Sequence, residues 1–153
     1  MGRFARFLSL VTLESFAASS IGLAVGSAVP SAEAANALGP AVMVLFIVFG
    51  GYYVNSENVP WMLRWVPKAS LIRHGFEGLC VNEFRGLTFD ADKPTDLATG
   101  EDVLQRFGFA RSTCWRSGIG LARVILFNYL LTYGTLANTK PKFQPMLEPK
   151  PRM

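Results

Sequence analysis

The sequence predicts an all-α membrane protein with three transmembrane helices, re-entrant or interfacial helices and an external loop. Three long apolar runs, at residues 7–29, 37–54 and 119–137, contain only two charged side chains, Glu14 and Arg123. Charged residues make up 17% of the 153-residue chain, whereas about 25% is usual in soluble domains. The apolar residues are therefore gathered into segments of the length that crosses a bilayer.

The first run, residues 7–29, has small side chains at helical spacing in its second half. Ala18, Gly22 and Gly26 are four residues apart, with Ser20, Ala24 and Ala28 beside them. Small residues at this spacing allow helix backbones to approach closely in lipid, where van der Waals packing drives association. We expect this face to pack against another helix.

The same N-terminal region also has features of a secretory leader. Arg3 and Arg6 precede the apolar run, and the triplet at residues 32–34 has the A-x-A form of a cleavage site. However, the run is longer than the 7–15 apolar residues of a typical leader, and Glu14 interrupts it. A transmembrane helix is the preferred interpretation, and a secreted protein with a cleaved leader is an alternative.

Residues 30–36 form a short polar connection to the second run, residues 37–54. Two apolar helices joined so closely should run antiparallel, as a hairpin through the bilayer. A helix over residues 37–54 would be roughly 27 Å long, close to the thickness of the hydrocarbon core. We expect Pro40 in its first turn, where the missing amide hydrogen costs little, and two tyrosines, Tyr52 and Tyr53, near its end.

Residues 55–118 are predicted to be a re-entrant and external region. Trp61 and Trp65 lie on an apolar face that follows Pro60; this segment is too short to span and should lie in the interface or dip into it. In the next helical segment, residues 69–84, Arg73 and Glu77 are four apart and are expected to pair. A short helix is expected to start near residues 99–101, within the most polar part of the chain.

The third run, residues 119–137, should be the last transmembrane helix. Arg123 lies near its first end and can extend to the lipid headgroups. Asn128 and Thr132 share a face and are expected to bond to neighbouring helices. The tail, residues 138–153, is rich in Lys, Arg and Pro, and we expect it to be disordered and cytoplasmic by the positive-inside rule.

Cysteine, histidine and basic residues suggest neither a metal site nor a nucleic-acid interface. Cys80 and Cys114 are either two free thiols or one disulfide. His74 has no Cys or carboxylate at ligand spacing that would indicate a metal site. The Lys and Arg residues do not cluster as in a nucleic-acid-binding stripe.

Four segments of the chain resemble one family. They are SFAASSIGLAVGSAVPSAEAANALGP, FIVFGGYYVNSENVPWMLRWVPKASLIRHGFEGLCVNEFRGLTF and the later ATGEDVL and KPKFQ segments. Together they resemble the C-terminal part of the membrane domain of ABC transporters of the G subfamily, of the ABC-2 type, and most of all the plant and algal half-transporters. The resemblance makes residues 1–137 a partial ABC-2 type transmembrane domain whose helices 7–29, 37–54 and 119–137 correspond to the fourth to sixth of the family.

The resemblance also implies roles for particular residues. By position, Pro40, Val44 and Ile47 would line a substrate cavity at a two-fold dimer axis. Tyr52 and Tyr53 occupy the external gate, where the best-known members have leucines, so the gate here departs from the family pattern. The re-entrant and loop contacts are expected at Arg73, Glu77, Asn82 and Glu83, which either tune the external gate or hold the re-entrant turn together.

Two polar side chains within the predicted spans, Glu14 and Asn128, are candidates for functional contacts. A carboxylate in lipid is costly and often functional. Glu14 could relay a signal to a nucleotide-binding half, or it could be a partly hydrated residue bonded to a neighbouring helix. We favour the second interpretation.

The predicted function is the membrane-spanning portion of an ABCG-type, ATP-driven exporter of lipophilic compounds such as lipids or sterols. The chain has no G-x-x-x-x-G-K-[ST] phosphate loop, so we expect no catalytic residues, metal or cofactor in it. ATP and Mg would bind to a separate or missing nucleotide-binding domain. Expected partners are the bilayer, that domain, the remaining membrane helices, and a second half-transporter in a homo- or heterodimer.

The expected location is the plasma membrane or an organelle membrane such as that of a plastid. A membrane-anchored interaction protein or fragment without transport activity is the other alternative, beside the secreted protein. The sequence does not specify the substrate.

Overall fold

The computed structural model describes residues 2–50, 61–63, 65–89 and 98–139. Their only β feature is an isolated bridge between Thr88 and Thr99. The all-α fold predicted from the sequence is therefore confirmed. The helices are α1 (Gly2–Ala28), α2 (Ala32–Val48), the 3₁₀ helix η2 (Trp61–Leu63), α3 (Val66–Ala69), α4 (Leu71–Phe84), α5 (Gly100–Arg106) and α6 (Cys114–Asn138).

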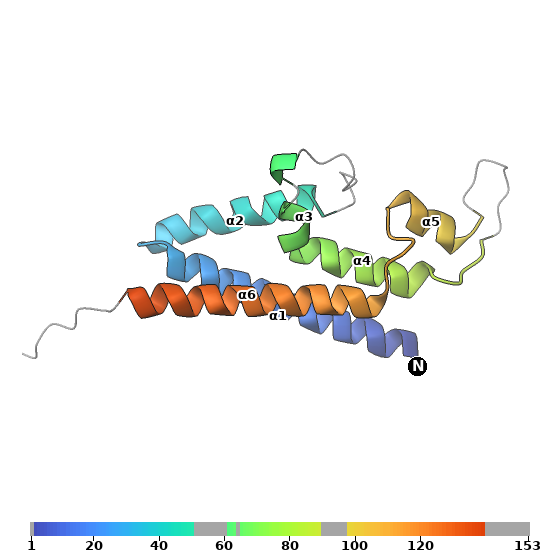
Figure 1. The fold of residues 1–153 in the computed structure, drawn as a ribbon, viewed down its shortest axis with the longest axis horizontal. Helices are drawn as coiled ribbons and strands as arrows, with labels where there is room; N and C mark the ends of the chain where they lie inside the picture. Colours follow the sequence, from blue (N-terminus) through green and yellow to red (C-terminus); the bar gives the residue numbers. More distant parts are fainter. Residues whose placement is uncertain (1, 51–60, 64, 90–97, 140–153) are drawn as a thin grey trace, which may run out of the picture.

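The two longest helices, α1 and α6, lie side by side and run in the same direction (Figure 1). The chain returns from the end of α1 through α2, and α4 continues in the direction of α2 along the first half of α1 (Figure 1). α4 contacts both α1 and α6, and α5 packs on α4. The result is an elongated bundle in which α4 lies along the first half of α1 and α2 lies along the second half (Figure 1).

Both α1 and α6 are long and apolar enough to cross a membrane, with 27 and 25 residues. α2 is also apolar but has 17 residues. At about 1.5 Å per residue it is roughly 25 Å long. A third span at α2 remains a prediction.

A continuous apolar core joins the helices. It is built from Leu10, Ala17 and Ile21 of α1 and from Leu121 and Val124 of α6. Other buried members come from α2, α3 and α4: Phe46, Val66 and Leu71. This single cluster holds the bundle together.

Only part of the expected set of small residues in α1 is buried. Gly22 and Gly26 are exposed, and a side chain added at either position would meet nothing within 4 Å. Ala17, Ser20 and Ala24 are the buried small residues of α1. The expected contact is therefore wrong for the two glycines, whereas Ser20 and Ala24 beside them are buried and Ala18 packs partly against the core.

Helix-capping side chains explain why α2 and α6 begin earlier than predicted. The Ser31 hydroxyl accepts a hydrogen bond from the Ala34 amide (3.2 Å), so α2 starts five residues before residue 37. Thr113 caps α6 in the same way by accepting from the Arg116 amide (3.3 Å). Such caps satisfy amides that have no partner within the helix.

The earlier start of α2 moves Pro40 from the predicted first turn into the interior of the helix. A proline at that position removes one hydrogen bond of the helix. α2 ends at Val48, and the predicted last residues of that helix, including Tyr52 and Tyr53, lie outside the described part of the chain.

A serine joins α2 to α4. The Ser70 hydroxyl donates to the carbonyl of Phe46 (3.2 Å) and accepts from the amide of Arg73 (3.2 Å). Ser70 is fully buried, and it is the N-cap of α4. One side chain thus starts α4 and ties it to the end of α2.

Gly78 provides a test of the packing around α4. A side chain added there would come within 3.0 Å of Leu10 and of Ser117, on two different helices. We expect Gly78→Leu to reduce the free energy of unfolding by about 1–3 kcal/mol, the usual cost of overpacking, measured by denaturant titration of the chain in detergent micelles. Gly22→Leu is the matched control and should leave stability unchanged or slightly raised, because its side chain enters open space. Equal effects of the two variants would contradict the packing of α4 against α1 and α6.

Candidate functional site

Glycines allow α4 to lie against its two neighbours. The Glu14 carboxylate of α1 occupies the space that a side chain at Gly75 would fill. On the other side, Gly120 of α6 leaves room for the ring of His74, whose Nδ1 would be 2.5 Å from an added carbon. The residues of α4 therefore hold fixed positions between α1 and α6.

Glu14 is partly buried at this contact. Its carboxylate touches α4 but makes no hydrogen bond or ion pair within the described ranges. The expected bond to a neighbouring helix is thus absent within the described residues of this chain, and the carboxylate stays available to groups outside those residues.

The predicted pair of Arg73 and Glu77 does not form an ion pair. The Glu77 carboxylate lies 4.0 Å from Nδ1 of His74 instead. The Arg73 guanidinium lies over the ring of Phe109, 5.7 Å from its centroid. Burial lowers the pKa of Arg73, and the charge of Glu77 opposes this effect. Arg73 thus contacts Phe109 from outside α4, whereas Glu77 approaches His74 of its own helix.

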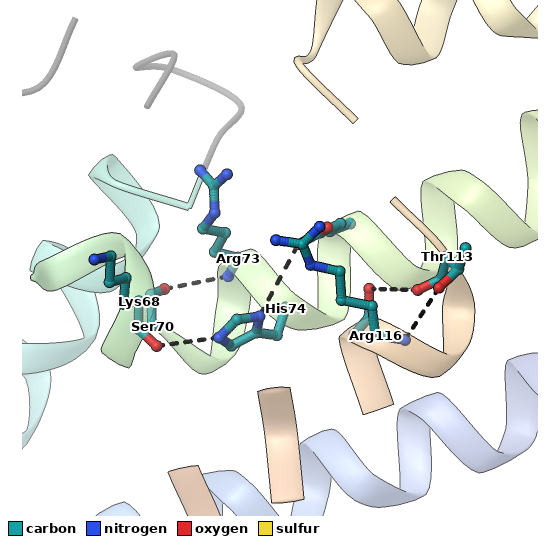
Figure 2. Close-up of polar contacts among 8 residues, drawn as sticks. Lys68, Ser70, Arg73, His74, Thr113 and Arg116 are labelled. Atoms are coloured by element: carbon teal, nitrogen blue, oxygen red, sulfur yellow. Dashed lines mark hydrogen bonds and ion pairs between the residues drawn. The ribbon is translucent and has the colours of Figure 1, made fainter. Parts of the chain in front are cut away.

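His74 also fixes the start of α4. Its Nε2 donates a hydrogen bond to the backbone carbonyl of Lys68 (3.1 Å), and Figure 2 shows this contact beside the Ser70 cap. This role cannot be predicted from the sequence, because the contact between His74 and Lys68 depends on how the chain turns between α3 and α4.

Asn82 ties the other end of α4 to α1. Its side-chain amide donates to the carbonyl of Arg3 (3.1 Å), while its Oδ1 is buried and unpartnered among the described residues. The Arg3 guanidinium donates in turn to the carbonyl of Arg85 (3.0 Å). Glu83 is exposed. Of the expected re-entrant contacts, Asn82 is thus placed to hold the turn.

α5 and the residues that follow it pack on α4. Thr99 and Asp102 form a reciprocal capping box at the start of α5, as the pattern at residues 99–101 predicted. Phe109, which follows α5, is fully buried and meets the ring of Phe76 edge to face, with centroids 5.6 Å apart. Aromatic packing of this kind fixes the segment between α5 and α6 to the bundle.

A cavity of about 550 Å³ lies between α1, α2 and α6. Apolar side chains form most of its wall, and Asn128 is one of the few polar groups in it. Lys68 and Arg123 also contribute to the wall. Apolar walls with a few polar groups are typical of small-molecule sites. The apolar lining includes Ile21, Val25, Leu38, Val42, Phe46, Val124, Phe127 and Leu131.

The polar residues of α6 bond differently from the prediction. Asn128 donates to the carbonyl of Val124 in its own helix (2.8 Å), and Thr132 donates to the carbonyl of Asn128 (2.8 Å). The hydrogen bond between α1 and α6 comes from Thr135, which donates to the Ser27 hydroxyl (2.8 Å). The sequence did not single out this pair, because both residues look like ordinary small polar residues in an apolar helix.

The predicted substrate-cavity residues lie on the opposite face of α2 from this cavity. Pro40 is exposed, and Val44 and Ile47 are 59% and 45% exposed. Their spacing of four and three residues puts them in one stripe. This stripe is apolar and has no partner among the described residues, whereas Val42 and Phe46 face inward.

Both cysteines are free thiols, with Cys80 buried and Cys114 partly buried. Of the two alternatives left open by the sequence, the structure has the two free thiols. Burial raises the pKa of Cys80 to about 11. No group of three His, Cys, Asp or Glu side chains that could hold a metal occurs in the ranges that the structure describes.

The fold and these surfaces define a helical membrane domain. Comparison with protein families matches residues 1–84 to the family described as ABC-2 type transporter. The chain belongs to this family. The resemblance inferred from the sequence phrases is confirmed.

Individual relatives agree with this assignment. The chain is 50% identical to ABC transporter G family member 7 of Arabidopsis thaliana over 146 residues, which are 95% of this chain and 20% of that protein. It is 29% identical to ABC transporter G family member 1 of Dictyostelium discoideum over 136 residues (85% of this chain, 17% of that protein). It is 30% identical to Protein white of Drosophila melanogaster over 135 residues (85% and 20%). The chain thus spans about a fifth of the length of the curated relatives it matches.

The raised pKa of Cys80 gives a pH-dependent prediction. Burial disfavours the thiolate, so Cys80 in the folded chain should ionise near pH 11, above the ordinary value of 9.0. The measurement is the ultraviolet absorbance of the thiolate in a Cys114→Ser variant, with the absorbance of a variant lacking both cysteines subtracted. The same variant unfolded in denaturant should titrate near the ordinary value. A folded-state midpoint near 9 would mean that Cys80 is not enclosed by α4, α5 and α6.

Proposed function

We propose that this chain forms the membrane-spanning portion of an ABCG-type, ATP-driven exporter of lipophilic compounds. Membership of the ABC-2 type transporter family supports a transport role. The observation that carries the proposal is the exposed apolar stripe of α2, because it is a surface that needs either lipid or a second subunit to cover it.

In this proposal, Pro40, Val44 and Ile47 line a substrate cavity formed with the same face of a second half-transporter, in a homo- or heterodimer. Lipids and sterols fit an apolar lining of this kind. Tyr52 and Tyr53 then form the external gate above the cavity. The packing of α2 leaves this stripe free, since Phe46 on the opposite side is buried in the core.

ATP binding and hydrolysis belong to a nucleotide-binding domain outside this sequence, which also holds the Mg ion. The contribution of this chain is binding and gating, without covalent chemistry. Glu14, at the contact between α1 and α4, is available to respond to movements of the remaining membrane helices. The membrane concerned is the plasma membrane or that of an organelle such as a plastid.

The alternative of a cleaved leader conflicts with the packing of α1. Cleavage near residues 32–34 would remove Leu10, Ala17 and Ile21, which belong to the core. N-terminal sequencing of the mature protein tests this point: a start near residue 33 would exclude the hairpin of α1 and α2.

Val44→Arg tests the proposed transport function. In a transporter reconstituted from this chain, the remaining membrane helices and a nucleotide-binding half, we expect at least a tenfold loss of ATP-dependent export of a fluorescent lipid. The reason is that a charge in an apolar cavity is costly to desolvate. Leu23→Arg on α1 is the matched control, because Leu23 is similarly exposed at 51% but lies outside the proposed cavity.

Both variants must reach the membrane in equal amounts for the comparison. Unchanged export by Val44→Arg would refute the cavity assignment. Membrane insertion and assembly without export by the unmodified chain would favour the membrane-anchored interaction protein instead.

A further inference from the structure

A second cavity, of about 860 Å³, lies between α4, α6 and the segment that joins α5 to α6. Basic side chains dominate the charge of its wall, and Glu77 is the only carboxylate in its lining among the described residues. This balance differs from that of the apolar cavity between α1, α2 and α6. The basic residues are Lys68, Arg73, Arg111, Arg116 and Arg123.

The charges of these residues are largely uncompensated. Glu77, which could neutralise one of them, lies closest to His74 (4.0 Å). None of Lys68, Arg111, Arg116 and Arg123 forms an ion pair with another described residue. Like charges around a partly enclosed space repel one another more strongly than in bulk water. An anion in the cavity would relieve this repulsion.

Several of the basic side chains reach the cavity from different elements. Figure 2 shows Arg116 extending from the first turn of α6 towards His74 of α4, with Lys68 in α3 and Arg73 in the first turn of α4. The amide of Arg116 is held by the Thr113 cap (3.3 Å), and Arg73 is held over Phe109. The backbone positions of these cations are therefore fixed before any ligand binds.

The cavity opens onto a stripe of α6 that suits the chains of a lipid. Ile119 and Arg123 line the cavity, and Leu126, Leu130 and Tyr133 follow on the same face at spacings of three and four. These three side chains are 61%, 62% and 74% exposed. Trp115, also in the lining, is 79% exposed, and exposed Trp beside Arg is typical of the headgroup level of a membrane. A molecule with its charge in the cavity would have its apolar part along this stripe.

From this arrangement we propose that the cavity binds the phosphate-bearing headgroup of an anionic lipid, with the acyl chains along the α6 stripe. Arginine suits this role because its planar guanidinium forms paired hydrogen bonds to phosphate oxygens. The proposal concerns binding alone and holds whether or not the chain takes part in transport.

The test compares lipid association with the chain in phosphatidylcholine nanodiscs. Spin-labelled phosphatidylglycerol should associate with the chain at least tenfold more strongly than spin-labelled phosphatidylcholine. Each substitution, Arg111→Gln or Arg116→Gln, should reduce this preference about fivefold, as expected for one cation near a lipid headgroup. Both residues are exposed, so the fold should be retained, and circular dichroism checks this.

Arg106→Gln is the matched control. Arg106 is an exposed arginine at the end of α5 that does not line the cavity, so its removal should leave the preference unchanged. An equal loss in all three variants would mean a general effect of surface charge and would overturn the proposal, as would the absence of any preference in the unmodified chain.

A competition experiment separates a lipid from a free phosphate compound. Short-chain dihexanoyl-phosphatidylglycerol should displace the labelled lipid, whereas soluble glycerol phosphate at the same concentration should not. Displacement by glycerol phosphate with equal strength would show that the α6 stripe contributes nothing, and the lipid assignment would then be wrong.

Discussion

Gly75, Gly78 and Gly120 have no side chain, so α4 can lie directly against α1 and α6. The other features of the fold depend on this contact. With α4 in place, the end of α2 is held by Ser70, and the start of α1 is held by Asn82. α5 and the segment that follows it then pack on the remaining side of α4 through Leu104 and Phe109. A displaced α4 would release all three connections together.

The position of α4 also separates two cavities of different chemistry. The cavity between α1, α2 and α6 is almost wholly apolar, whereas the cavity between α4 and α6 is basic. Lys68 and Arg123 line both, so the boundary between them is a pair of long cationic side chains. Such side chains place their stems against apolar surface and their charges in a polar region.

Helix type and approximate position could be predicted from the sequence, because long apolar runs with few charges have few other interpretations. Membership of the ABC-2 type transporter family was also predictable, since it rests on local phrases of sequence. Helix starts were missed by up to five residues. The caps Ser31 and Thr113 precede the apolar runs, and several polar residues are included in the first turns that they begin. Hydrophobicity therefore marks the apolar part of a helix and does not show the residue at which the helix begins.

The sequence by itself determined that apolar helices form, that one short helix starts near Thr99, and that α4 carries Arg73 and Glu77 four residues apart. Only the tertiary structure decided which faces meet, because helices of mixed small and apolar residues have several faces that could pack. It buried Ala17, Ser20 and Ala24 and left Gly22 and Gly26 exposed, placed Arg73 over Phe109 instead of beside Glu77, and gathered five cations from distant positions around one cavity. Each of these outcomes depends on rotation and register between helices, which the spacing within one helix does not fix.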